Sequence, residues 1–298
     1  MTQLQSCLIT PSYKPDFKKC CLLAESIDSY AVFPIQHYIV VDRKDLRLFQ
    51  QLENSYRKVV TVESILPWWI QKLPLLKNGW FSFQTLPVRN WLMQQIIKLE
   101  IVNHIAEDVL IFVDSDVTFV RDFNSQQFIQ GNRVRLFRVE LSPSDPSFSS
   151  LDLTTQTKWQ NTAASLLGIS SLSTVIVPNP FIGYVGNVIT WRKDNVLKLH
   201  RHIERVTGKS WIKAIASCWN FSEYMLYGIF VDRVLKENSG HYWDSQRSCQ
   251  EYWGTTPLNQ KQLQQFFQTM PDEAFSIMIS AKSDTPVSAY APLVKNVS

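Results

Sequence analysis

The chain has 298 residues, 45% of them hydrophobic and 19% charged, with a formal net charge of only +4. This balance predicts an ordinary globular protein with one large domain, or one domain whose C-terminal half is elaborated. No block of like charges occurs, which argues against a nucleic-acid-binding protein, although a small positive excess at one pocket would suit an anionic small molecule.

The first 70 residues alternate strand and helix signals. An apolar run at residues 7–10 leads into the turn PSYKPD, and the next segment has apolar residues at helical spacing. Residues 37–42 and 58–63 predict two further strands. Strand, helix and strand of these lengths indicate a βαβ unit and a mostly parallel sheet.

A helix and a buried strand then lead to the most distinctive motif. Residues 88–105 carry one apolar helical stripe, and the apolar run 109–113 ends in Asp114-Ser115-Asp116. In open α/β sheets, ligands bind outside the carboxyl ends of the strands. We therefore expect the residues at the strand ends to share one rim: Thr10, Asp42, Asp114 and Asp116.

After residue 123 the alternation fades. The segment NRVRLFRVEL predicts a strand, residues 194–206 a helix that stops at Gly208, and Ser222 the N-cap of a further helix. GHYWD is expected to lie in a loop. No repeat or linker divides the chain, so we expect a single domain over 1–298.

The paired aspartates have several interpretations. Two residues apart at a strand end, Asp114 and Asp116 can lean into one pocket as hard oxygen ligands for Mg²⁺ or Mn²⁺. Such an ion suits a phosphate or diphosphate substrate. A polar loop capping a core strand explains them without any metal.

LIFVDSDVT also resembles the opening motif of haloacid-dehalogenase-type phosphatases, in which Asp114 would be the nucleophile and Asp116 a general acid/base. Against this, 113 residues precede the motif, and no paired-acid segment follows it.

Three later segments follow the motif in order: NPFIGYVGN, FSEYMLYG and GHYWD. With them, the chain from about residue 6 to residue 244 resembles the GT-A class of nucleotide-sugar glycosyltransferases, and more loosely a family of poorly characterised bacterial glycosyltransferase-like proteins. The resemblance implies a GT-A-like, Rossmann-like α/β fold, with a mostly parallel central sheet flanked by helices and an irregular C-terminal acceptor part. It also implies a nucleotide-binding half (1–123) and an acceptor and catalytic half (124–298).

The resemblance assigns roles to individual residues. Asp114, Asp116 and His241 would hold Mn²⁺ or Mg²⁺, and Glu223, at the start of a helix, would be the general base. A second group would contact the donor: Thr10, Pro11, Ser12, Tyr13, Asp42, Arg89, Gln94, Lys98, Asp114, Ser115 and Gly183.

Ordinary structural roles remain open for these positions. Glu223 also fits a routine acid in a first helical turn, His241 a loop histidine, and Gln94 with Lys98 a solvated helix face. The neighbouring Trp68 and Trp69 could stack on an acceptor sugar or belong to the core or an interface.

The resemblance predicts transfer of a sugar, with inversion of stereochemistry, from a nucleotide diphosphate donor of the UDP class to a hydroxyl acceptor. Polysaccharide or glycolipid synthesis would be the setting. A haloacid-dehalogenase-type phosphatase and a non-catalytic nucleotide-sugar-binding module are the alternatives.

Cysteine content and hydropathy bear on the compartment. The five cysteines form no CxxC pair, so neither zinc nor a disulfide framework is expected. The N-terminus has no signal-peptide pattern, and no apolar run approaches the ~18 residues of a membrane span. We expect a cytoplasmic protein, with peripheral contact to the inner face of the membrane left open.

Overall fold

The computed structural model describes residues 4–73, 79–141, 153–169 and 181–295. Its central sheet has the strand order β13-β7-β1-β2-β3. Four strands are parallel, namely β1 (Ser6–Pro11), β2 (Gln36–Val41), β3 (Arg57–Thr61) and β7 (Val109–Phe112). The edge strand β13 (Ile189–Arg192) runs antiparallel to β7. The predicted mostly parallel sheet is therefore confirmed.

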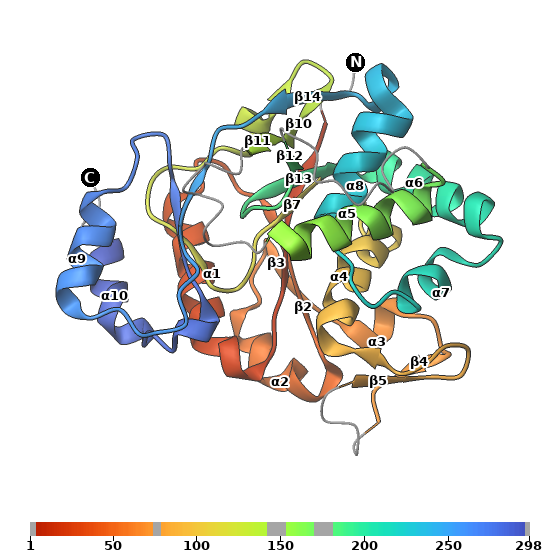
Figure 1. Cartoon of the computed structure of the whole chain (residues 1–298). Helices are drawn as coiled ribbons and strands as arrows, with labels where there is room; N and C mark the ends of the chain where they lie inside the picture. Colours follow the sequence, from red (N-terminus) through yellow and green to blue (C-terminus); the bar gives the residue numbers. More distant parts are fainter. Residues whose placement is uncertain (1–3, 74–78, 142–152, 170–180, 296–298) are drawn as a thin grey trace.

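Helices cover both faces of this sheet, which explains why its strands are continuous apolar runs. Helix α1 (Phe17–Tyr30) lies on one face and α4 (Asn90–Glu100) on the other (Figure 1). Short helical turns join β2 to β3: Arg43–Asp45, α2 (Leu46–Phe49) and Gln50–Leu52. Similar turns flank the two long helices: Lys14–Asp16 before α1 and Ile101–Asn103 after α4.

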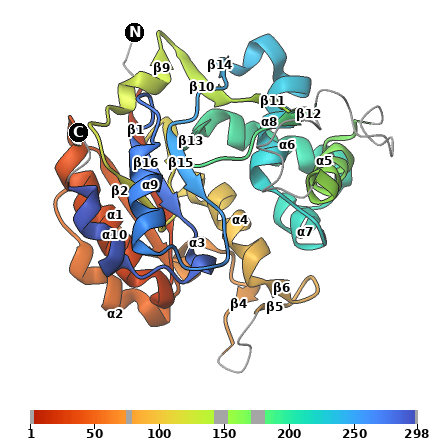
Figure 2. The same ribbon diagram turned by 60° about the vertical axis from the view of Figure 1, so that its left-hand side comes forward.

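A small antiparallel sheet projects from the body between β3 and α4 (Figure 2). It follows α3 (Val62–Ile65) and consists of β4 (Ile70–Gln71), β5 (Gly79–Ser82) and β6 (Val88–Arg89). We call this unit, with the turns around it, the β4–β6 arm.

The second half builds a layer beside α4. Its helices are α5 (Leu153–Leu167), α6 (Lys193–Thr207), α7 (Trp211–Ala216) and α8 (Glu223–Ile229). They pack with α4 into the largest hydrophobic core. As predicted, Gly208 ends α6 in the left-handed region (φ 66°), and the Ser222 hydroxyl caps α8 by accepting a hydrogen bond from the Met225 N–H. A π-helical segment, Phe230–Leu235, and a 3₁₀ turn, Lys236–Ser239, follow.

GHYWD is a strand rather than the expected loop. Residues His241–Asp244 form β14, which pairs in parallel with β10 (Arg133–Phe137), with Val134 opposite His241. The partner strand lies about a hundred residues earlier, so no local sequence pattern predicts the pairing. Two further short pairings complete this region: β9 (Ile129–Gln130), after the turn Ser125–Phe128, pairs with β10, and β11 (Val139–Leu141) with β12 (Phe181–Gly183).

The C-terminal segment returns to the paired aspartates. Strand β8 (Val117–Phe119), directly after them, pairs with β16 (Ser276–Ile279), which pairs in turn with β15 (Cys249–Tyr252). Helices α9 (Gln260–Gln268) and α10 (Val287–Val294) lie beyond α1 (Figure 1). In the part of the chain that is described, no helix is long and apolar enough to cross a bilayer.

Candidate active site

The paired aspartates occupy a tight turn between β7 and β8. The Val117 N–H donates to the Asp114 carbonyl (3.0 Å), which closes the turn. The Asp114 side chain is 40% exposed. Asp116 is anchored from the C-terminal segment, because its Oδ2 accepts a hydrogen bond from the Ala281 N–H (2.9 Å).

A third carboxylate lies near this turn. Asp16 ends the 3₁₀ turn after β1 and is buried, with its Oδ1 3.6 Å from the Lys19 Nζ. Burial raises the pKa of Asp16, and the charge of Asp114 adds to this. Burial likewise raises the pKa of Asp116 to about 6, with contributions from Asp114 and Asp16. The charge of Asp114 contributes to both raised pKa values, so the three acids together form a site of concentrated negative charge.

Asp16 was not among the site residues predicted from the sequence, although it lies in the PSYKPD turn that follows β1, at the edge of the sheet where ligands were expected.

Lys98 connects the aspartate turn to Glu223. It projects from α4, is buried, and places its Nζ 3.1 Å from Asp114 Oδ1 and 3.1 Å from Glu223 Oε1. The same Nζ donates to the Tyr224 hydroxyl (2.8 Å). Burial opposes the charge of Lys98, but Asp114, Tyr224 and Glu223 together raise its pKa well above the usual value. Lys98 is therefore a fixed cation between two acids and does not lie on a solvated helix face with the exposed Gln94.

Glu223 is the first residue of α8 and is held at both its backbone and its side chain. Its N–H donates to Gln95 Oε1 on α4 (3.0 Å), and its carboxylate is 6% exposed beside Lys98. Burial raises the pKa of Glu223 and Lys98 opposes that rise. The structure thus brings the predicted base and Asp114 into contact with the same ammonium group.

A pocket of about 830 Å³ opens at the carboxyl ends of β1 and β2. Five predicted donor-contacting residues line it: Pro11, Ser12, Tyr13, Asp42 and Gln94. The structure adds two aromatic and three basic residues that the sequence did not predict: Trp80, Trp91, Lys14, Lys44 and Lys72.

Two features of this pocket bear on ligand binding. Ser12 lines the pocket and is buried, and its side chain is hydrogen-bonded to the Cys20 side chain beneath it. The Asp16 N–H donates a hydrogen bond to the Tyr13 carbonyl (2.9 Å), which places the carboxylate cluster beside the pocket; burial raises the pKa of Tyr13, and the charges of Asp16 and Asp116 add to this.

Other predicted donor-contacting residues lie outside the pocket lining. Thr10 is fully buried, and its hydroxyl is 2.9 Å from His37 Nε2. Arg89 stacks on Trp219 at 4.2 Å and donates to the Trp219 carbonyl. Gly183 ends β12 opposite Val139, and Ser115 is buried in the aspartate turn.

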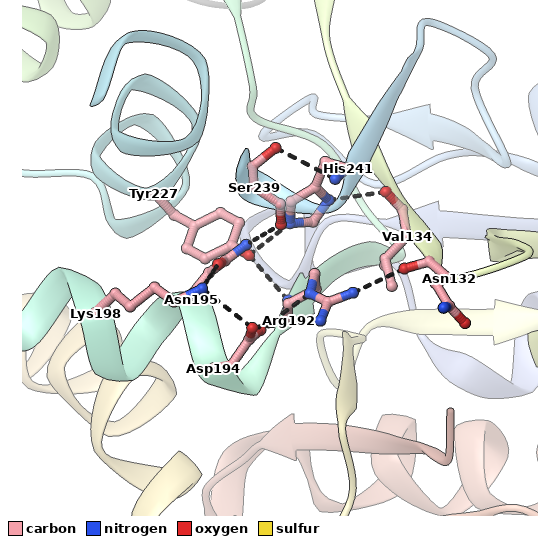
Figure 3. A network of polar contacts seen from close by, with 9 residues as sticks. All are labelled: Asn132, Val134, Arg192, Asp194, Asn195, Lys198, Tyr227, Ser239 and His241. Carbon is pink, nitrogen blue, oxygen red and sulfur yellow. Dashed lines mark hydrogen bonds and ion pairs between the residues drawn. The ribbon is translucent and has the colours of Figure 1, made fainter. Parts of the chain in front are cut away.

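His241 belongs to a network of polar contacts around Arg192 and Tyr227 (Figure 3), near the end of the sheet at which β7 begins. It contacts Tyr227, whose oxygen accepts from the Arg192 N–H, and Arg192 pairs with Val109 at the start of β7. Asp114 follows β7 at its other end, about 16 Å further along at strand spacing. The structure therefore does not bring His241 to Asp114 and Asp116.

Both ring nitrogens of His241 already have protein partners. Nδ1 is 2.8 Å from the Val134 carbonyl, which can only accept, so Nδ1 carries the proton. Nε2, 2.7 Å from the Tyr227 oxygen, then accepts from the Tyr227 hydroxyl. Burial lowers the pKa of His241 to about 4, so the ring is neutral. His241 holds β14 against β10 and α8, a role that replaces the predicted metal ligation.

The remaining oxygen ligands suit a divalent ion shared with a substrate. Within the described residues there is no group of three or more His, Cys, Asp or Glu side chains able to hold a metal by themselves. Mg²⁺ and similar ions are usually held by one or two carboxylates together with substrate phosphates. The Asp114 and Asp116 pair fits that arrangement.

Comparison with known proteins supports the fold. Residues 4–294 match the model of a family of unknown function, DUF6492, and the chain belongs to this family. No curated protein matches it. Among solved structures, the apo form of mouse xyloside xylosyltransferase 1 is similar, with a TM-score of 0.50 and 11% identity over 94% of this chain and 99% of the mouse chain. At this identity the similarity concerns the fold alone, which is the glycosyltransferase-like α/β fold expected from the sequence.

Proposed function

We propose that this member of the DUF6492 family is a metal-dependent glycosyltransferase. It would move a sugar from a nucleotide diphosphate donor, of the UDP class, to a hydroxyl of a glycan or glycolipid. One observation supports this above all others: the 830 Å³ pocket lies near the acid cluster of Asp114 and Asp116, and Lys98 links Asp114 to Glu223.

In this proposal the pocket holds the nucleoside. Tyr13, which is 45% exposed, offers a ring for stacking on the base. Asp42 and Ser12, which both line the pocket, would supply polar contacts to the base or ribose. These contacts would orient the donor so that its diphosphate points to the aspartate turn.

Asp114 and Asp116 would hold Mn²⁺ or Mg²⁺. When bound, this ion neutralises charge on the departing diphosphate. Lys98, whose Nζ lies 3.1 Å from Asp114 Oδ1, would hold the Asp114 carboxylate in place for the ion.

Glu223 would be the general base. The acceptor hydroxyl gives its proton to the Glu223 carboxylate while its oxygen forms a bond to the anomeric carbon. The bond from that carbon to the diphosphate oxygen breaks, and the nucleotide diphosphate leaves. Direct displacement of this kind inverts the anomeric configuration. Burial raises the basicity of Glu223 and Lys98 keeps it oriented, two conditions that favour proton transfer.

The test is nucleotide release from a panel of UDP-, GDP- and CDP-sugars in the presence of Mn²⁺. Glu223→Gln should bind nucleotide as the wild type does and lower the turnover rate by about 10²–10⁴-fold, the usual contribution of a general base. Asp114→Asn should lose both binding and turnover.

Two other outcomes would contradict the proposal. Beryllofluoride trapping at Asp114, with release of inorganic phosphate from phosphate monoesters, would identify a phosphatase. Nucleotide binding without release from any donor in the panel would indicate a binding module.

A further inference from the structure

Large apolar side chains are exposed on the β4–β6 arm and on the loop after α7. Leu86 (81%), Trp219 (74%) and Trp68 (72%) are the three most exposed large hydrophobic residues of the described chain, and Phe83 is 63% exposed. Side chains of this size are normally exposed singly and not in groups.

These residues lie on the arm or against it. The Trp68 and Phe83 rings are 6.1 Å apart, and Leu86 lies in the turn between β5 and β6. Arg89 on β6 stacks on Trp219 at 4.2 Å, which joins the loop after α7 to the arm. In Figures 1 and 2, α7 lies on the same side of the molecule as β4 and β5. We call Trp68, Phe83, Leu86, Arg89 and Trp219 the arm face.

The segments that form the arm face have no negative side chains. The sequence has no Asp or Glu between Glu63 and Glu100, or between Glu204 and Glu223. Among the described residues, and apart from the buried Lys98, these segments contribute basic groups at Lys72, Arg89, Arg205, Lys209 and Lys213. The net charge of the whole chain is only +4, so this excess is local.

We propose that the arm face docks on an anionic membrane surface. Tryptophan and phenylalanine insert at the boundary between headgroups and acyl chains, and basic residues are attracted to anionic lipids. A soluble glycan fits this surface less well, because a glycan needs hydrogen-bonding groups beside the aromatic rings, and Leu86 offers none.

Docking would orient the candidate active site. Lys72 and Trp91 line the pocket, and Lys72 follows β4 in the arm while Trp91 follows β6. The mouth of the pocket would then lie near the lipid surface. If the proposed transferase function holds, on which this consequence rests, a lipid-borne hydroxyl is the acceptor class that this orientation favours.

The test is co-sedimentation of the full chain with vesicles of neutral phosphatidylcholine alone or with 30% phosphatidylglycerol, a fraction of about one anionic lipid in three. We expect binding to the anionic vesicles, weakened by added salt. Trp219→Ala, Phe83→Ala and Leu86→Ser should each lower the partition coefficient by about tenfold, and the triple variant should abolish binding.

The chain supplies matched controls. Trp243 is 63% exposed and carries Arg138 stacked at 4.4 Å, just as Trp219 carries Arg89, but it lies on β14, far from the arm (Figure 1). Phe33 is 62% exposed and matches Phe83. Trp243→Ala and Phe33→Ala should leave vesicle binding unchanged.

Three results would overturn the proposal: no binding of the wild type to anionic vesicles, an equal loss in the control variants, or a dimer in solution that the arm-face variants dissociate. The vesicles contain no nucleotide and no acceptor, so failure here leaves the nucleotide-binding result of the proposed function untouched. Failure of nucleotide binding likewise leaves the vesicle result standing.

Discussion

At the scale of single residues, the ammonium group of Lys98 has two neighbours with different proposed tasks. It lies 3.1 Å from an oxygen of Asp114, a proposed metal ligand, and 3.1 Å from an oxygen of Glu223, the proposed base. Lys98 and Glu223 are both buried, and Lys98 is the principal compensation for the charge of Glu223, while Asp114 and Glu223 share the compensation of Lys98. Removal of one partner of a buried pair leaves an uncompensated charge, which costs more than the pair itself contributes.

Lys98→Met should therefore lower the free energy of unfolding by about 3–5 kcal/mol, measured with urea at pH 7.5. The double variant Lys98→Met with Glu223→Gln should lose less than the sum of the two single changes, by about 1–3 kcal/mol. Lys198→Met is the control. That lysine pairs with Asp194 at 3.2 Å on the surface and should cost less than about 1 kcal/mol. Strict additivity of the two changes would refute the coupling.

At the scale of elements, α8 depends on a glycine for its position against the loop after β12. A Cβ at Gly228 would lie 2.2 Å from the Tyr184 ring. Tyr184 cannot move away easily, because it is buried and donates a hydrogen bond to Asp232 Oδ2 (2.7 Å). Glycine is retained there for close packing, although alanine is the better helix former by about 1 kcal/mol.

Gly228→Ala should consequently destabilise the protein by about 1–3 kcal/mol in urea denaturation, the usual cost of overpacking. On a Tyr184→Ala background the same change should be neutral or stabilising, since the clash is gone. Stabilisation by Gly228→Ala in the otherwise unchanged protein would contradict this account of the packing.

The elements that could be predicted are those whose patterns are local. The strands β1, β2 and β7 are continuous apolar runs, and α6 and α8 carry their own end signals at Gly208 and Ser222. Strand β14 was missed because its side chains are only partly buried and its partner β10 lies far along the chain.

The candidate site also contains residues that local patterns predict and residues that only contacts between distant segments place. The two-residue spacing of the acids, and the expectation that the strand ends share one edge of the sheet, were sufficient to predict Asp114, Asp116 and several pocket residues. Sequence alone could not show that Lys98 turns inward, that Ala281 anchors Asp116, or that His241 lies at the far end of β7. Each of these depends on contacts between residues that are distant in the chain.

At the scale of the whole molecule, buried histidines affect stability in acid. Burial lowers the pKa of His37 to about 3, that of His200 to about 3 and that of His241 to about 4. Between the unfolded value of ~6.5 and these pKa values, the unfolded chain binds protons that the folded chain does not. Each histidine therefore makes the free energy of unfolding fall as the pH falls from about 6.5 towards 4.

The contribution of His241 can be isolated by comparing His241→Gln with the wild type at pH 7.5 and pH 5.0. At pH 7.5 the variant should be less stable, because it loses the bonds to Val134 and Tyr227. At pH 5.0 this difference in the free energy of unfolding should shrink by about 2 kcal/mol. The unfolded wild type then binds a proton at His241 that the folded wild type does not bind, and the variant has no such group. A difference independent of pH would contradict a neutral, buried His241.

The central claim, a nucleotide diphosphate site completed by a divalent ion on the paired aspartates, is tested most directly by thermal unfolding with UDP, GDP, CDP and CMP, each with and without Mn²⁺. A nucleoside diphosphate with Mn²⁺ should stabilise the wild type by about 2.7 kcal/mol at 100 times Kd. Asp116→Asn should abolish this effect, and Asp272→Asn, at an exposed acid elsewhere, should retain it. The absence of any Mn²⁺-dependent stabilisation with all four nucleotides would contradict the account.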